Sequence, residues 1–97
     1  MLIQSPYKVG DIVSIKLTSG EEMVATLESE NDTELVLRKP FMLVAGDQGA
    51  GLAPFMFTVD ADAKFTVRLN TIICIVKTAK DASDTYLQST TGLTVVN

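Results

Sequence analysis

The stretch from residue 13 to residue 40 constrains the fold most, because its apolar side chains recur at every second position. Apolar and polar residues alternate in VSIKLT at 13–18 and, except at Val24, in MVATLE at 23–28, and LVL follows at 35–37. Side chains on a strand point to opposite faces in turn, so each run gives one apolar and one wet face. Turn residues separate the runs at Ser19-Gly20 and at Glu30-Asn31-Asp32. This pattern predicts three successive antiparallel strands.

The course of the chain after residue 37 is less determined. The third strand is expected to continue through Pro40 into residues 41–44, and Pro40, which lacks a ladder donor, marks a bulge, a kink or an edge position. Residues 45–51, AGDQGAG, predict a mobile hairpin loop. The fourth strand is formed by residues 52–59, by residues 65–69, or by both as one long bent strand, and periodicity alone does not choose.

The last expected strand, residues 72–76, is apolar on both faces. A strand with one wet face should alternate, so this strand must be covered on both sides. The rest of the sheet covers one face of this strand. The other face is covered either by the C-terminal tail or by a neighbouring subunit. Cys74 lies inside this run and is therefore expected to be a core thiol.

The tail from residue 81 to residue 91 predicts a short helix. Asp81 or Ser83 can cap its start, and Gly92 suits its end. Its apolar face is thin and consists chiefly of Ala82, Tyr86 and Leu87. A helix this short is marginal alone, so we expect it to dock on the barrel.

Two segments resemble the sequence motifs of the Sm and Sm-like family. The spacing V-x-I-K-L-x-x-G-x-x-M-x-x-T-L from Val13, followed by a polar turn and LVL, resembles the first motif, and VRLNTIICI at 67–75 is similar to the second. The resemblance implies an all-β fold, a small, strongly bent, five-stranded antiparallel Sm-like barrel over about residues 8–78. With the helical tail over about residues 80–92, residues 1–97 are expected to form a single Sm-like domain.

The family also implies an assembly. Adjacent Sm barrels pair the fourth strand of one with the fifth strand of the next, which closes a homo-oligomeric ring, here expected to have five to seven subunits. The doubly apolar last strand fits this use, since a donated strand edge has both faces buried. The interface is expected to contain Phe55, Phe57, Ile73 and Ile75.

Within the family, the chain looks closest to short Sm-like proteins of tailed phages, including those of cyanobacteria. Lys39-Pro40, residues 52–56 and the segment from Tyr86 to Gly92 carry this likeness. No secretory signal is visible in the sequence, and no apolar run approaches the roughly 20 residues needed to span a bilayer, so we expect neither a leader nor a membrane span. We therefore expect a cytoplasmic protein that contacts no membrane, located in the host cell if a phage encodes it.

Sm rings hold a uridine base at the inner rim, between an aromatic or histidine side chain and the arginine of the second motif, while an asparagine contacts its edge. Carried over to this chain, the arginine is Arg68, the stacking position falls at Thr33 and the asparagine position at Glu34. The aspartate before the stacking residue corresponds to Asn31 or Asp32. These five residues form the predicted single-stranded RNA site, a degenerate uridine-type pocket without an aromatic side chain.

Charge and residue types limit the function classes. The net charge is −4 and there is no histidine, which removes Ser-His and Cys-His nucleophile pairs and most zinc sites. We therefore expect no catalytic residues, no metal and no cofactor. Two functions stay open: a ring involved in RNA binding and RNA metabolism, or an oligomeric protein-interaction scaffold that has lost RNA binding. For Arg68, an RNA contact and a salt bridge to acidic neighbours are both open, whereas Arg38 and Lys39 are expected to form salt bridges.

Overall fold

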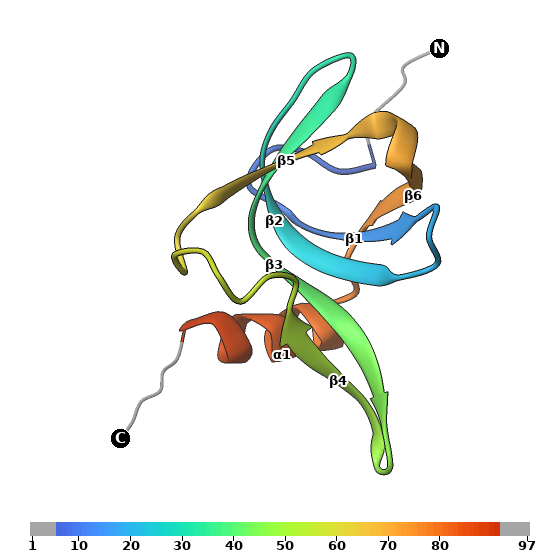
Figure 1. Ribbon diagram of the computed structural model, residues 1–97, viewed down its shortest axis with the longest axis vertical. Coiled ribbons are helices and arrows are strands. Elements are labelled where there is room, and N and C mark those ends of the chain that lie inside the picture. Colours follow the sequence, from blue (N-terminus) through green and yellow to red (C-terminus); the bar gives the residue numbers. More distant parts are fainter. Residues whose placement is uncertain (1–5, 92–97) are drawn as a thin grey trace.

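The computed structural model describes residues 6–91 of the 97-residue chain, which form a bent antiparallel sheet and one helix (Figure 1). The strands follow the order β4-β3-β2-β1-β6, and β5 also pairs with β3. Their bounds are β1 Ile12–Leu17, β2 Glu22–Glu30, β3 Glu34–Gly46, β4 Gly49–Pro54, β5 Lys64–Arg68 and β6 Ile72–Lys77, with a 3₁₀ turn at Leu69–Thr71 and the helix α1 at Lys80–Thr91. This architecture confirms the predicted all-β barrel with a C-terminal helix, but the sheet has six strands where five were predicted.

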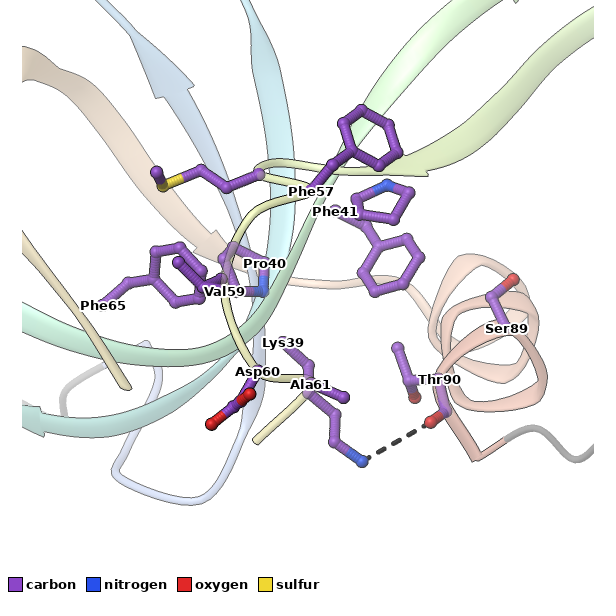
Figure 2. A pocket seen from close by; sticks show the side chains of 12 residues that line it. Lys39, Pro40, Phe41, Phe57, Val59, Asp60, Ala61, Phe65, Ser89 and Thr90 are labelled. Atoms are coloured by element: carbon purple, nitrogen blue, oxygen red, sulfur yellow. Dashed lines mark hydrogen bonds between the residues drawn. The ribbon is translucent and has the colours of Figure 1, made fainter. Parts of the chain in front are cut away.

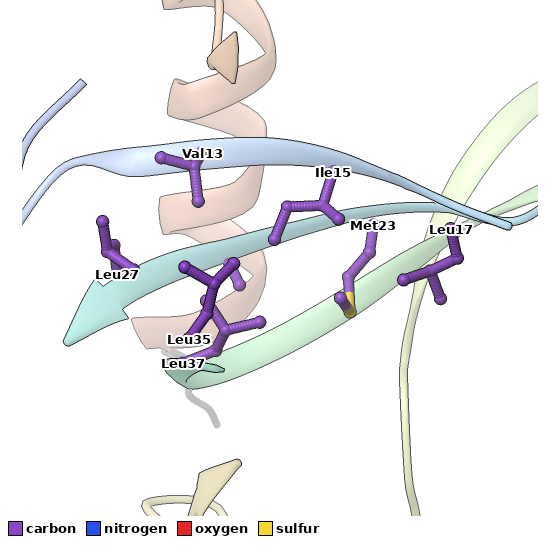
Figure 3. Packing of buried hydrophobic residues seen from close by; sticks show 8 residues of the cluster. Val13, Ile15, Leu17, Met23, Leu27, Leu35 and Leu37 are labelled. Atoms are coloured by element: carbon purple, nitrogen blue, oxygen red, sulfur yellow. The ribbon is translucent and has the colours of Figure 1, made fainter. Parts of the chain in front are cut away.

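The core lies between the inner faces of β1, β2 and β3, where the alternating apolar residues meet (Figure 3). Each of these side chains is removed from water, which stabilises the fold by roughly 1.5–3 kcal/mol for a fully buried aliphatic side chain. The buried cluster contains Val13, Ile15 and Leu17 of β1, Met23, Ala25 and Leu27 of β2, and Leu35 and Leu37 of β3. The period of two in the sequence therefore predicted the core side of all three strands.

A bulge at Lys39 and Pro40 divides β3 into two halves. Arg38 pairs with Thr26, but Phe41 already pairs with Val24, so two residues of β3 stand opposite one residue of β2. Lys39 has a φ of 50°, the only positive φ of a non-glycine residue in the described chain, and this bends the strand. The sequence left a bulge, a kink and an edge position open for Pro40. In the structure Pro40 lies in a bulge.

The two halves of β3 explain why the fourth strand was ambiguous. β4 pairs with the second half, from Phe41 to Gly46, and β5 pairs with the first half, from Glu34 to Arg38. Both candidate stretches therefore contribute a strand, and residues 55–63 between them form none. The predicted loop over residues 45–51 is too long, because only residues 47 and 48 lie between β3 and β4 and the small residues around them still pair through their backbone.

The helix α1 docks through a single buried aromatic residue. Tyr86 is only 1% exposed, and its ring meets that of Phe41 edge to face with the centroids 6.0 Å apart. Its hydroxyl lies 2.8 Å from the carbonyl oxygen of Lys39 and 3.2 Å from that of Arg38, and it shares a hydrogen bond of 3.0 Å with the hydroxyl of Thr26. The helix thus supplies a hydroxyl donor to the backbone carbonyl groups at the bulge.

This docking corrects two expectations. Val24 lies on the face of β2 that the sequence predicts to be wet, yet it is buried where β2 meets the second half of β3 and α1 covers their outer side. Asp81 and Ser83 lie inside α1, and the N–H of Ser83 donates to the carbonyl oxygen of Ala79, so neither residue is the N-cap. Gly92, the expected end of the helix, lies outside the described residues.

β6 is not covered on both faces within the described residues. Ile72 and Ile75 pack against the core, but Ile73 is 64% exposed and Cys74 is exposed as well. The expectation of a core thiol at Cys74 is wrong for the single chain, because α1 packs at the bulge of β3 instead of over β6. The sequence left the C-terminal tail and a neighbouring subunit open as the cover of this strand. Residues 80–91 of the tail do not cover it.

Candidate nucleic-acid interface

The β2–β3 turn and the end of β5 lie side by side in the sheet. Glu34 is the cross-strand partner of Arg68, and the N–H of Leu69 donates to the carbonyl oxygen of Thr33 over 2.9 Å. Residues that are more than thirty positions apart in the sequence are therefore neighbours here. The structure brings the five predicted site residues together: Asn31, Asp32, Thr33, Glu34 and Arg68.

Asn31 shapes the turn with its side chain. Its carbonyl oxygen accepts hydrogen bonds from the backbone N–H groups of Thr33 and Glu34, each over 2.9 Å, and from the Thr33 hydroxyl over 3.3 Å. Asparagine is common in turns because its side chain can accept backbone hydrogen bonds two or three residues ahead. The side-chain oxygen of Asn31 is thus engaged in holding the turn.

Arg68 is exposed at the end of β5. Within residues 6–91, no carboxylate lies within 4.0 Å of its guanidinium group, although Glu34 faces it across the strand pair. Its carbonyl oxygen accepts the hydroxyl hydrogen bond of Thr71 over 2.7 Å, which fixes the start of the 3₁₀ turn. Of the two roles open for Arg68, the salt bridge is therefore not formed in the described chain.

Two other cations near this edge, Arg38 and Lys64, are already paired with a carboxylate. Nε of Arg38 lies 2.6 Å from one carboxylate oxygen of Glu28, and Nζ of Lys64 lies 3.2 Å from the other. The Arg38 contact is an ion pair rather than a well-directed hydrogen bond, since its N–H does not point at the oxygen. Lys39 contacts no carboxylate there, and its ammonium group donates to the carbonyl oxygen of Thr90 over 3.4 Å. The salt-bridge expectation is confirmed for Arg38 and wrong for Lys39.

Glu28 gives the barrel a measurable pH dependence. The hydrogen bond from Lys64, then the charges of Lys64 and Arg38, lower the pKa of the Glu28 carboxyl in the folded chain, against the opposing effect of desolvation. The stability that this carboxylate contributes is present above the ordinary glutamate pKa, about 4.3. It is lost as the pH falls through the lower pKa of the folded state.

We therefore expect Glu28→Gln to flatten the acid side of the stability profile. The melting temperature of the variant should depend less on pH than that of the wild type between pH 3 and pH 6, as measured by circular dichroism. Asp62→Asn, at an exposed turn outside this ion-pair group, serves as the control and should follow the wild type. Parallel profiles for wild type and Glu28→Gln would contradict this assignment.

A groove of about 320 Å³ lies between the bulge of β3, the segment after β4 and the end of α1 (Figure 2). Phe57 stands on its rim and is 80% exposed. No signal in the sequence alone could have located this groove, since three separate segments form it. It is lined by Lys39, Pro40, Phe41, Pro54, Met56, Phe57, Val59, Asp60, Ala61, Phe65, Ser89 and Thr90.

The four residues predicted for the subunit interface fall into two pairs. Phe55 packs against the core and meets Phe65 edge to face at 6.3 Å, and Ile75 packs against the core from β6. Phe57 and Ile73 are largely exposed in the single chain. Only this second pair offers its apolar surface to another molecule without any change in the barrel.

Two further kinds of site are absent from residues 6–91. No three of their Cys, Asp and Glu side chains are grouped so that they could hold a metal ion. Nor does that part of the chain contain a helix with the length and apolar character needed to cross a membrane.

Comparison with known proteins supports the fold through structure and not through sequence. Neither a protein-family model nor a curated protein matches the sequence. Among solved structures, a heptameric archaeal Sm protein matches with a TM-score of 0.51 and 18% identity, over 73% of this chain and 90% of that chain. The SmAP1 heptamer of P. aerophilum matches with the same TM-score and identity, over 73% of this chain and 82% of that chain. The chain therefore has the fold of Sm proteins, as the two motifs predicted.

Proposed function

We propose that this chain forms a homo-oligomeric ring of the Sm type and that the inner rim of the ring binds single-stranded RNA around Arg68. The observation that carries the proposal is β6, a strand that is apolar, exposed and unpaired along one edge in the described chain. Both solved structures named above are heptamers of proteins with this fold. In a ring of five to seven subunits, a neighbouring copy would cover the exposed apolar side chains and the unpaired edge of β6.

Two strand edges support this mode of assembly. β6 pairs only with β1, and β5 pairs only with β3, so each keeps one edge without a partner within residues 6–91. When β6 of one copy pairs with β5 of the next, both sets of backbone groups are satisfied and Ile73 leaves the solvent. Each interface of the ring then uses one edge of each kind, as a closed cyclic assembly requires.

Arg68 supports the RNA contact. Its guanidinium group is exposed and makes no ion pair in the described chain, so it is available to an anion. Cyclic symmetry would place one such arginine per subunit around the rim. A planar guanidinium can stack on a base and contact a phosphate, which suits a single strand passing along the rim.

The alternative function is a ring that has kept assembly and lost RNA binding, so that it serves as a protein-interaction scaffold. Specific features of the site favour it. Thr33 has no aromatic face for a base, the Asn31 oxygen holds the turn, and the Glu34 carboxylate lies across from Arg68 where it would repel a phosphate. The net charge of −4 also favours the scaffold function, because a negatively charged chain repels the phosphates of RNA.

Both functions are binding roles without catalysis, and both use one Sm-like domain over residues 1–97. The likeness of Lys39-Pro40, of residues 52–56 and of the segment from Tyr86 to Gly92 to Sm-like proteins of tailed phages adds a prediction about origin. Under that prediction the ring works in the cytoplasm of the host cell.

Arg68→Ala tests the RNA proposal. We expect a labelled single-stranded oligouridine to bind the wild-type ring at low salt and to bind the variant about tenfold more weakly, a loss of about 1.4 kcal/mol. Fluorescence anisotropy measures the affinity, and native mass spectrometry of protein purified without nuclease shows whether RNA copurifies. Arg68→Lys, which keeps the charge and loses the planar group, should fall between the two. A wild-type ring that binds no RNA at low salt would leave only the scaffold function.

A further inference from the structure

The second half of β3 and β4 form a two-stranded arm, residues 41–54, that leaves the barrel and points away from it (Figure 1). β3 pairs with β2 only as far as Met42, which faces Met23, and beyond that it pairs only with β4. The arm is therefore a ribbon with two unpaired edges within the described chain. A two-stranded ribbon that contacts nothing else is marginally stable in water.

The composition of the arm is unusual for an exposed strand edge. Asp47 is the only charged residue from residue 41 to residue 59 in a chain that is 21% charged. Leu43 and Val44 are exposed on β3, and the sequence of β4 is GAGLAP. Proteins protect exposed edges against pairing with charged side chains, bulges or proline, and here only Pro54 does so, at the end nearest the barrel.

From these features we propose that the arm joins two copies of this protein, with β4 of one copy pairing antiparallel to β4 of the other about a twofold axis. In such a contact residue i of one strand meets residue j of the other and j meets i, so a charged residue would appear twice in the same short contact, and near the axis the two like charges would be neighbours. β4 carries no charge, and the small residues from Gly49 to Gly51 add no bulk beside the new partner. Two copies of such an uncharged strand can therefore pair without electrostatic repulsion between them.

The proposal rests on the proposed ring and extends it. Cyclic symmetry makes all arms of one ring equivalent, and in the proposed assembly they point along the ring axis, so two rings would meet through as many arm pairs as each has subunits. Each pair is short, but linked contacts can exceed the affinity of one contact by about 10²–10⁴. Residues 55–63 separate β4 from β5, so the arm edge and the edge used within the ring are distinct.

Ala50→Lys tests the arm contact. Ala50 is exposed on the arm, where a lysine can reach solvent in the free chain but would bring two like charges into each β4–β4 contact. Native mass spectrometry and light scattering should give a double ring for the wild type and half that mass for Ala50→Lys. Ala50→Thr, which adds bulk and no charge, should keep the double ring. The circular dichroism spectra of all three proteins at room temperature should coincide, which shows that each variant is folded.

The possible outcomes separate the arm contact from the ring. A wild type that stays a single ring at every concentration, or an Ala50→Lys variant that keeps the double mass, overturns the arm contact. A wild-type dimer that Ala50→Lys splits into monomers of 10.5 kDa supports the arm contact and overturns the ring.

Discussion

Replacing Ile73 by aspartate is expected to turn the proposed ring into monomers while the barrel stays folded. Ile73 is 64% exposed in the single chain and lies where the pairing of β6 with β1 is irregular, so a carboxylate there remains in water. In the ring the same carboxylate would be buried between two copies without a partner. The cost of burying such a charge is several kcal/mol at each interface, which is enough to prevent closure. Light scattering measures the mass, and circular dichroism the melting curve.

Two control variants show whether the effect depends on the exposed face of β6. Ile75→Asp places the charge opposite Ile15 against the core, so it should unfold the chain itself. Val9→Asp changes another exposed aliphatic residue, outside the strands, and should leave the ring intact. If Ile73→Asp keeps the mass of the wild type, β6 does not form the subunit contact. The sequence alone treated Ile73 and Ile75 as equivalent, and only the register of β6 separates them.

The barrel core could be predicted from the sequence because it depends on local periodicity. Val13, Ile15 and Leu17 alternate strictly, and the same holds for the inner face of β2, so the strand type and the buried face follow from the period of two. The two motifs also predicted that the β2–β3 turn and Arg68 would lie together, which the pairing of Glu34 with Arg68 confirms. These features are set by residues close in sequence or by a known arrangement of strands.

The outer surface could not be predicted because it depends on contacts distant in sequence. Val24 is buried since α1 docks at the bulge of β3, more than forty residues later in the chain. Cys74 sits in an apolar run and is still exposed, because its apolar surroundings are not supplied by the described chain. An apolar strand thus indicates that a cover is needed and does not say which molecule provides it.

The contacts of single side chains at the candidate site could not be predicted from the sequence either. The motif placed Asn31 near the base-binding position, but its side-chain oxygen accepts three hydrogen bonds within the turn. The sequence indicated acidic neighbours for Arg68, yet the acidic residue that forms ion pairs at this edge is Glu28, and it binds Arg38 and Lys64. Which carboxylate meets which cation follows from the register of β2, β3 and β5, and the position of the bulge sets that register.

The second large effect is expected at Tyr86, because this one side chain joins α1 to the bulge of β3. Tyr86→Ala removes a fully buried aromatic ring and its contact with Phe41, a change that typically costs about 3–5 kcal/mol. Folded domains of this size are stable by only about 5–15 kcal/mol, so the variant should unfold at a much lower urea concentration. Leu87→Ala, at the next and more exposed position of α1, is the control and should lose far less. Equal urea midpoints for the two variants would show that α1 does not dock through Tyr86.

Tyr86→Phe separates the ring from its hydroxyl. The variant keeps the aromatic contact and leaves the carbonyl groups at the bulge without this donor, which should cost about 1–3 kcal/mol and thus less than Tyr86→Ala. Burial raises the pKa of the Tyr86 phenol above its ordinary value of about 10. The stability linked to the protonated phenol is present below that value and is lost as the pH rises through the folded-state pKa. Tyr86→Phe should therefore lose less stability than the wild type between pH 9 and pH 11, and an unchanged alkaline profile would place the hydroxyl outside the docking contact.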